Sequence, residues 1–266
     1  MNKEAEQILD EIRARKERNK SASREYFESI YNDMCAKGFP ISEAINFSYD
    51  ISESNQIDYH YELICENWMH QSKQLQQIGA GFYRHGREGF DYLFGQMDSD
   101  SEQGNDIAYL IAQNLEEIRH LDYYIYYCDK LIPYLIRYME NDICEIRRKA
   151  IIALGWIGTK KEIPILCECI LTDGDSLCRS WAATAFMQMT YHRVSKASAK
   201  SKKVKDTFIQ AFEQETDLFA LGCYIITLQA LFEKRWLSSS SAENQDREKI
   251  MKARKTAVNF LKKDNK

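Results

Sequence analysis

The sequence predicts an all-α protein, an α-solenoid (superhelix) of stacked antiparallel helix pairs. The first observation is an internal repeat, in which Ile163-Pro-Ile-Leu follows Ile132-Pro-Tyr-Leu at an offset of 31 residues and Arg179 follows Arg147 at an offset of 32. The second is that only three prolines and eleven glycines interrupt 266 residues, and no alternating strand pattern is present. A repeat of this length is one pair of helices, which must stack on similar pairs to bury its apolar face.

The predicted elements begin with a helix over residues 2–20, in which Ala5, Ile8, Leu9 and Ile12 recur at helical spacing before a highly charged end. Three more helices are expected before residue 80: one that ends at Gly38-Phe-Pro40, a short one capped by Ser42 and running towards Asp50, and one from Ile57 to about Ile78.

Helix pairs are predicted from residue 88 onwards, and the two matched units occupy about 130–158 and 162–190. Pro133 and Pro164 suit the first turn of a helix, where a missing N–H costs nothing. A weaker unit follows, then a solvated linker over residues 238–244 and a basic helix from about Asp246. The expected domains are an N-terminal helical region over 1–80, repeats over 81–237, and a linker with a capping helix over 238–266.

Composition is typical of a soluble folded protein, with 44% hydrophobic and 29% charged residues and a net charge of −4. The longest apolar stretch, Ala220 to Phe232, is shorter than the roughly 20 residues of a membrane span. The first residues lack the apolar region of a signal peptide. We therefore expect no membrane association and a cytoplasmic location. The eight cysteines form no CxxC pair, which favours buried, reduced thiols over a metal site.

Catalytic motifs are absent from the sequence. The five histidines form no HExxH, and no two of them are spaced for a shared helical metal face. Gly79-Ala-Gly81 lacks the lysine of a phosphate loop. Tyr83-Arg-His-Gly-Arg87 is interpreted as a solvated turn, with anion binding as the alternative. We therefore predict no catalytic residue, no metal and no cofactor, and a function without enzymatic activity.

Residues 130–190 resemble the HEAT-repeat family. The resemblance rests on Ile146-Arg-Arg-Lys-Ala-Ile-Ile-Ala-Leu-Gly-Trp-Ile-Gly158, on Glu162-Ile-Pro-Ile-Leu, and on the run from Asp173 to Ala185. It implies the solenoid fold and leaves the activity open, because this scaffold carries unrelated functions. It also implies a structural role for Arg147 and Arg179, which we expect to bind Asp142 and Asp175 or the turn carbonyls.

The resemblance further implies that the proline-led helices line a concave surface where partners bind. By helical phase, the candidate partner-binding residues are Tyr134, Arg137, Tyr138, Glu162, Glu168 and Gln210. Tyrosine and arginine are enriched at binding hot spots. The alternative for each tyrosine is packing between the helix layers.

A basic segment lies between Tyr191 and Lys205, where six cations and no acid occur: Arg193, Lys196, Lys200, Lys202, Lys203 and Lys205. Interspersed serines and alanines predict a flexible loop between the helices of one repeat. Such a loop could bind phosphates or an acidic protein, and a merely solvated insertion is the alternative.

Two functions are consistent with these observations. The first is a non-enzymatic scaffold, either an adaptor or an inhibitor such as a toxin-neutralising immunity protein, that binds a protein on its concave face. The second is a DNA-binding protein similar to the HEAT-like alkylpurine glycosylases, suggested by Trp156, Trp181 and the basic segment. Both tryptophans are expected at core-like positions and no residue matches the catalytic aspartate, so the protein-binding scaffold is the preferred hypothesis.

Overall fold

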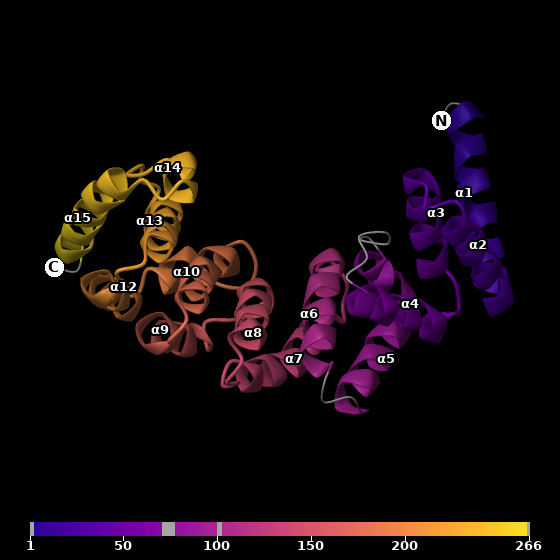
Figure 1. The fold of residues 1–266 in the computed structure, drawn as a ribbon, viewed down its shortest axis with the longest axis horizontal. Coiled ribbons are helices and arrows are strands. Elements are labelled where there is room, and N and C mark those ends of the chain that lie inside the picture. Colours follow the sequence, from indigo (N-terminus) through magenta and orange to yellow (C-terminus); the bar gives the residue numbers. More distant parts are fainter. Residues whose placement is uncertain (1–2, 71–77, 100–102, 265–266) are drawn as a thin grey trace. The chain divides into compact units, whose positions relative to one another are not determined.

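The computed structural model describes residues 3–70, 78–99 and 103–264. Within these residues the secondary structure is entirely helical (Figure 1), which confirms the predicted all-α solenoid class. The chain divides into two compact units, residues 1–123 (unit 1) and 124–266 (unit 2). Among the described helices, none has both the length and the apolar character needed to cross a membrane.

The described residues of unit 1 form the helices α1 (Lys3–Ser21), α2 (Arg24–Ala36), α3 (Ile41–Ser52), α4 (Ile57–His70), η2 (Gly79–His85), α5 (Gly86–Ser99), α6 (Gly104–Leu115) and η3 (Glu116–Ile118), of which η2 and η3 are 3-10 helices. The segment expected to extend α4 to Ile78 lies partly outside the described residues. The prediction that Ser42 caps α3 is wrong, because the cap position is Pro40 and Ser42 already lies inside the helix.

Unit 2 contains three antiparallel helix pairs and a C-terminal cap: α7 (Tyr124–Tyr138) with α8 (Cys144–Ile157), α9 (Ile163–Thr172) with α10 (Ser176–Thr190), and α12 (Lys202–Gln214) with α13 (Leu218–Phe232), followed by α14 (Ser239–Glu243) and α15 (Arg247–Asp264). A single turn, α11 (Lys196–Ala199), connects the second pair to the third. We call α7, α9 and α12 the A row and α8, α10 and α13 the B row.

Two local predictions in unit 2 are wrong. Pro133 lies inside α7, because the buried side chains of Tyr124, Tyr127 and Cys128 extend that helix towards the N-terminus. Pro164 does occupy the first turn of its helix, α9, as expected. The predicted linker after Leu237 includes a short helix, α14, whose cap is Ser238: its hydroxyl accepts a hydrogen bond from the Ser241 N–H at 3.2 Å.

The B row is packed more closely than the A row. Helix α10 lies against both α8 and α13, whereas α9 has a smaller contact with α12 and little with α7. Small residues permit the approach: a Cβ atom added to Gly155 of α8 would lie 3.1 Å from the Ala185 Cα of α10. A stack of helix pairs curves towards its more closely packed row. We infer that the B row, and not the proline-led A row expected from the sequence, lies on the concave side of unit 2.

Two half-buried arginines connect consecutive repeats through their turns. Arg147 donates to both carboxylate oxygens of Asp173, at 2.9 and 2.7 Å, and to the Asn141 carbonyl at 2.9 Å. Arg179 repeats the arrangement one unit later, with Glu215 at 2.7 and 2.9 Å and the Asp173 carbonyl at 2.8 Å. The expected bonds to turn carbonyls are thus confirmed. The carboxylate partners differ from Asp142 and Asp175, because each long side chain reaches forward to the next repeat.

We predict that Arg179→Ala destabilises the protein by about 3 kcal/mol, since it leaves the Glu215 carboxylate buried without its countercharge. The side chains of Arg179 and Glu215 are only 18% and 3% exposed. Urea-induced unfolding monitored by circular dichroism measures the loss. Arg137→Ala, at an exposed position of α7, is the matched control and should change stability by no more than about 0.5 kcal/mol. Equal losses for the two variants would contradict the structural role of Arg179.

We also predict a loss of stability in acid. Burial raises the pKa of Glu215 and of Asp173, but the hydrogen bonds from Arg179 and Arg147 and from nearby backbone N–H groups outweigh it, so both pKa values lie below their ordinary values. A lowered folded-state pKa stabilises the fold above the unfolded-state pKa, about 4 for these groups, and this contribution is lost as the pH falls through the folded value. The urea midpoint should therefore be flat between about pH 7 and 5 and fall below about pH 4.5. Glu215→Gln should be less stable at neutral pH and less sensitive to acid; an unchanged acid response would count against this assignment.

Candidate protein-binding site

Three of the predicted partner-binding residues form one cluster on α7. The Arg137 guanidinium carbon lies 5.3 Å from the ring centroid of Tyr134 and 5.7 Å from that of Tyr138. Arg137 is exposed and both tyrosines are half-buried. The guanidinium is thus held over two aromatic rings on the outer surface of the A row.

The other three predicted residues are dispersed. Glu168 on α9 and Gln210 on α12 are exposed. Glu162 is 7% exposed, and its carboxylate accepts hydrogen bonds at 2.7 Å from both the backbone N–H and the hydroxyl of Thr159. Because one of its oxygens closes the turn that precedes α9, Glu162 has hydrogen-bond partners within the chain, and we leave it out of the surface proposed below.

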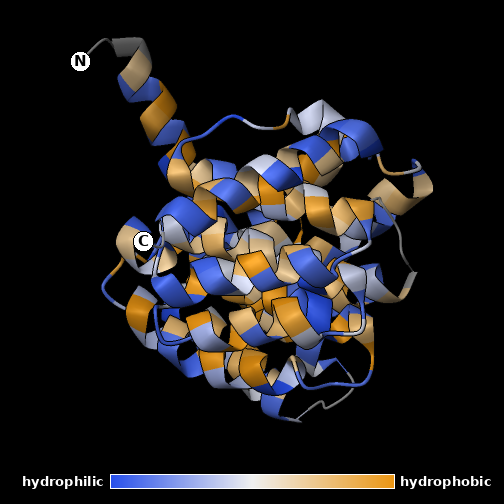
Figure 2. Ribbon diagram, turned by 90° about the vertical axis from the view of Figure 1, so that its left-hand side faces the viewer, coloured by the Kyte–Doolittle hydropathy of each residue, from blue (hydrophilic) through white to orange (hydrophobic). Residues whose placement is uncertain are grey.

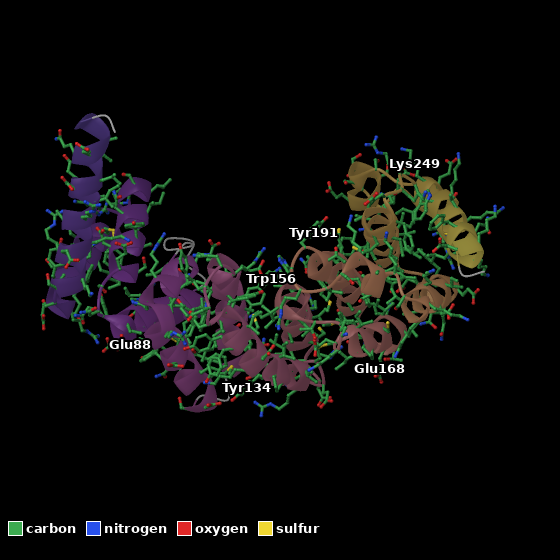
Figure 3. The ribbon with its side chains drawn as sticks, turned by 180° about the vertical axis from the view of Figure 1, so that it is seen from behind. Glu88, Tyr134, Trp156, Glu168, Tyr191 and Lys249 are labelled. Carbon is green, nitrogen blue, oxygen red and sulfur yellow. The ribbon has the colours of Figure 1, made fainter. Side chains whose placement is uncertain are left out.

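The B row presents a different surface, which we call the B-row face. It consists of half-buried side chains at helical spacing on three neighbouring helices: Ile152 and Trp156 of α8, Leu177, Trp181 and Thr184 of α10, and Phe219, Cys223 and Ile226 of α13. Figure 3 shows Trp156 and Tyr191 on one side of unit 2 and Tyr134 and Glu168 on the other. Most of these side chains are apolar, so this side of the unit carries a hydrophobic stripe.

The core-like positions expected for the two tryptophans are wrong. The side of α8 that contacts α10 is filled by small and aliphatic residues, among them Ala150 and Ala153, and the same holds for Ala182 and Ala185 of α10. An indole between two helices this close would force them apart. Trp156 and Trp181 therefore lie at the half-buried edge of the B-row face.

A cavity of about 190 Å³ opens on the B-row face between α10, α13 and α14. Its lining is mostly apolar, with Met187 from α10, Phe219 and Ile226 from α13, and Ala242 from α14. A dry cavity of about 150 Å³ holds a benzene molecule. This one therefore has room for a single aromatic or aliphatic side chain.

The basic segment is helical over much of its length and is bound to the rest of unit 2, in contrast to the predicted flexible loop. Lys202, Lys203 and Lys205 lie in α12, and Lys196 begins α11. The segment makes several ionic and cation–π contacts: Arg193 to Asp129 at 2.8 Å, Lys196 to Glu233 at 2.9 Å, Lys205 to Asp264 at 2.8 Å, and the Lys200 ammonium over the Phe232 ring at 5.3 Å. Much of its positive charge is therefore compensated within the chain.

Unit 1 contains a histidine pair that sequence spacing could not reveal. His60 Nδ1 lies 2.8 Å from His85 Nε2, and His60 Nε2 lies 2.8 Å from the Ile78 carbonyl oxygen. Burial lowers the pKa of His60 to about 3 and that of His85 to about 4. Arg84 beside them lies over the Tyr49 ring at 4.4 Å and donates to the Ser52 hydroxyl at 3.1 Å. The solvated turn expected at residues 83–87 is therefore partly a packed segment.

Within the described part of the chain, no group of three or more His, Cys, Asp or Glu side chains could hold a metal ion. The histidine pair packs beside η2, where His85 and Phe82 lie with ring centroids 4.9 Å apart.

The geometry of unit 2 defines an α-solenoid with a closely packed inner row and an arginine–carboxylate ladder in its turns. Comparison with protein families agrees: residues 99–187 match the family of HEAT repeats, so the predicted resemblance is confirmed for this part of the chain. HEAT repeats generally mediate protein–protein interactions. Comparisons with curated proteins and with solved structures give no match.

We predict that Cys223, on the B-row face, reacts slowly with thiol reagents in the folded protein. Burial raises its pKa to about 11, although hydrogen bonds with Ser180 and Thr184 act in the opposite direction. Only the thiolate is nucleophilic, so at pH 8 alkylation should be about 100-fold slower than for a thiol of ordinary pKa. Mass spectrometry of iodoacetamide-treated protein measures the rate of Cys223 alkylation. The exposed Cys35 is the internal reference, and the urea-unfolded chain is the control. Equal labelling of both cysteines in the folded protein would contradict the buried environment.

Proposed function

We propose that unit 2 is a protein-binding scaffold whose partner occupies the B-row face, and that it acts as an adaptor or inhibitor without catalysing a reaction. The observation that carries the proposal is the hydrophobic stripe containing Trp181 beside a cavity of about 190 Å³ on the closely packed row. Interfaces concentrate their binding energy in a few aromatic anchors that fill pockets and exclude water. Here the scaffold offers both an aromatic anchor and a pocket for one from the partner.

Two further features support this choice. The charged residues in the repeat turns, Arg147, Arg179, Asp173 and Glu215, are already bound to one another, so a partner gains little from them. The A row offers the Tyr134, Arg137 and Tyr138 cluster, whose cation–π geometry is confined to one helix. We therefore propose the A-row cluster, with Glu168 and Gln210, as a secondary contact surface.

A nucleic-acid partner, the second hypothesis from the sequence, has weaker support. Phosphate binding relies on cations that are free to release their counterions. Arg193, Lys196 and Lys205 are instead bound to carboxylates of unit 2.

The decisive experiment uses a photo-crosslinking amino acid at two matched positions, Thr184 on the B-row face and Glu168 on the A row. After irradiation of cells that produce the protein, mass spectrometry identifies the covalent adducts. We expect one protein to dominate the adducts formed from position 184, and much less of it from position 168. Crosslinking from 168 alone would overturn the assignment of the B-row face, and capture of nucleic acid would favour the second hypothesis.

With the partner identified, Trp181→Ala should weaken its binding by about 30-fold or more, the effect of losing a hot-spot aromatic residue. Tyr134→Ala, which also shortens a half-buried aromatic side chain, should reduce affinity by less than about fivefold. Isothermal titration calorimetry measures both, and circular dichroism checks that each variant is folded. The reverse order of effects would place the main contact on the A row.

A further inference from the structure

The first half of α1 carries a row of aliphatic side chains that face solvent. Ile8, Leu9 and Ile12 are 53%, 39% and 44% exposed. They recur at the spacing that aligns residues along one face of a helix. Helices of stable folds bury such a face, so this one lacks a counterpart within the described part of unit 1.

The second half of α1 attaches the helix to the rest of unit 1. Arg15 donates to the Asp50 carboxylate at 2.6 Å, Asn19 donates to the same carboxylate at 2.6 Å, and Lys16 forms an ion pair with Glu53 at 3.1 Å. The first turns of α1 extend beyond the end of α3 (Figure 1), and Figure 2 shows hydrophobic residues along this projecting segment. The aliphatic row is therefore displayed on a helix that is held only at its other end.

Apart from Lys3, the charges on α1 are segregated along its length. Residues 6–11 contain Glu6, Asp10 and Glu11 and no cation, whereas residues 13–20 contain five cations and one acid. Acid near the N-terminus and base near the C-terminus also complement the helix dipole. Combined with the exposed aliphatic row, the segregation makes the helix complementary to a second copy of itself in the antiparallel direction.

We propose that α1 is a dimerisation helix, which pairs antiparallel with α1 of a second copy of this chain. A two-fold axis near Leu9 brings the two aliphatic rows together. Glu6 and Arg13 are seven residues apart and therefore lie on the same edge of the row. Across the two-fold axis, Glu6 of each copy then faces Arg13 of the other, and the contact is self-complementary.

Existing contacts leave these charges available. Arg13 forms an ion pair with Asp10 one turn away at 3.2 Å, but the two side chains are 75% and 74% exposed. An exposed pair of this kind contributes little to stability and is readily exchanged for another partner. A parallel pair of α1 helices would instead place like charges together. A dimer would also carry two copies of unit 2, which strengthens binding to any partner that has two or more copies of the same binding site.

The test is the oligomeric state of the full chain, measured by sedimentation equilibrium from about 1 to 100 µM, the range suited to a small interface. We expect a concentration-dependent rise from the monomer mass of 31.2 kDa towards twice that value. Glu6→Arg and Arg13→Glu should each weaken dimerisation by about tenfold or more, because each places two like-charged pairs across the axis. The double variant Glu6→Arg/Arg13→Glu should restore it, since both ion pairs form again with reversed sign.

Ile8→Lys/Ile12→Lys should give a monomer at every concentration, and circular dichroism should show that its helicity and melting temperature are retained. Tyr26→Lys, at a 52% exposed position of α2, is the control and should dimerise like the parent chain. A parent chain that remains monomeric at about 100 µM overturns the proposal. So does a dimer that tolerates the lysine substitutions in α1, or a charge exchange that fails to rescue the single variants.

Discussion

The close approach of α8, α10 and α13 is the constraint on which the rest of unit 2 depends. Glycine and alanine at the contacts bring these helices together, as shown by the 3.1 Å between a Cβ built on Gly155 and the Cα of Ala185. Close packing excludes large side chains from the space between the helices. The tryptophans are consequently found on the B-row face, and the same packing that builds the stack also produces its hydrophobic surface.

The structure of the repeat turns follows from a second requirement, which is that buried polar groups need hydrogen-bond partners. Each turn ends one helix and begins another, which leaves carbonyl groups without helical partners. Arg147 and Arg179 bind those carbonyls and at the same time the carboxylate of the following repeat. One side chain therefore satisfies a turn and connects two repeats, which is why these charged positions of the repeat are structural.

The two units differ in how far the apolar residues of their terminal helices, α1 and α15, are buried. Unit 2 closes its stack with α15, whose Ile250, Ala253, Ala257 and Leu261 are buried. Unit 1 holds α1 mainly by polar contacts of its second half and leaves an aliphatic row exposed on its first half. A helix with this distribution is stabilised by pairing with a further helix. We therefore propose different roles for the two surfaces: the B-row face of unit 2 binds another protein, and α1 of unit 1 pairs with a second copy of this chain.

The sequence by itself determined the helical class, the repeat at 130–190 and the family resemblance, because these depend on local periodicity and on residues that recur at a constant offset. It also identified the residues of the aliphatic row in α1 and the cluster of Tyr134, Arg137 and Tyr138, since helical spacing places neighbours on one face. Only the tertiary structure decided which row is more closely packed, where the tryptophans lie, which carboxylates the arginines bind, and that His60 meets His85. Each of these features depends on the distance between neighbouring helices. Side-chain packing between segments about 25 to 36 residues apart sets that distance, and the local sequence pattern does not determine it.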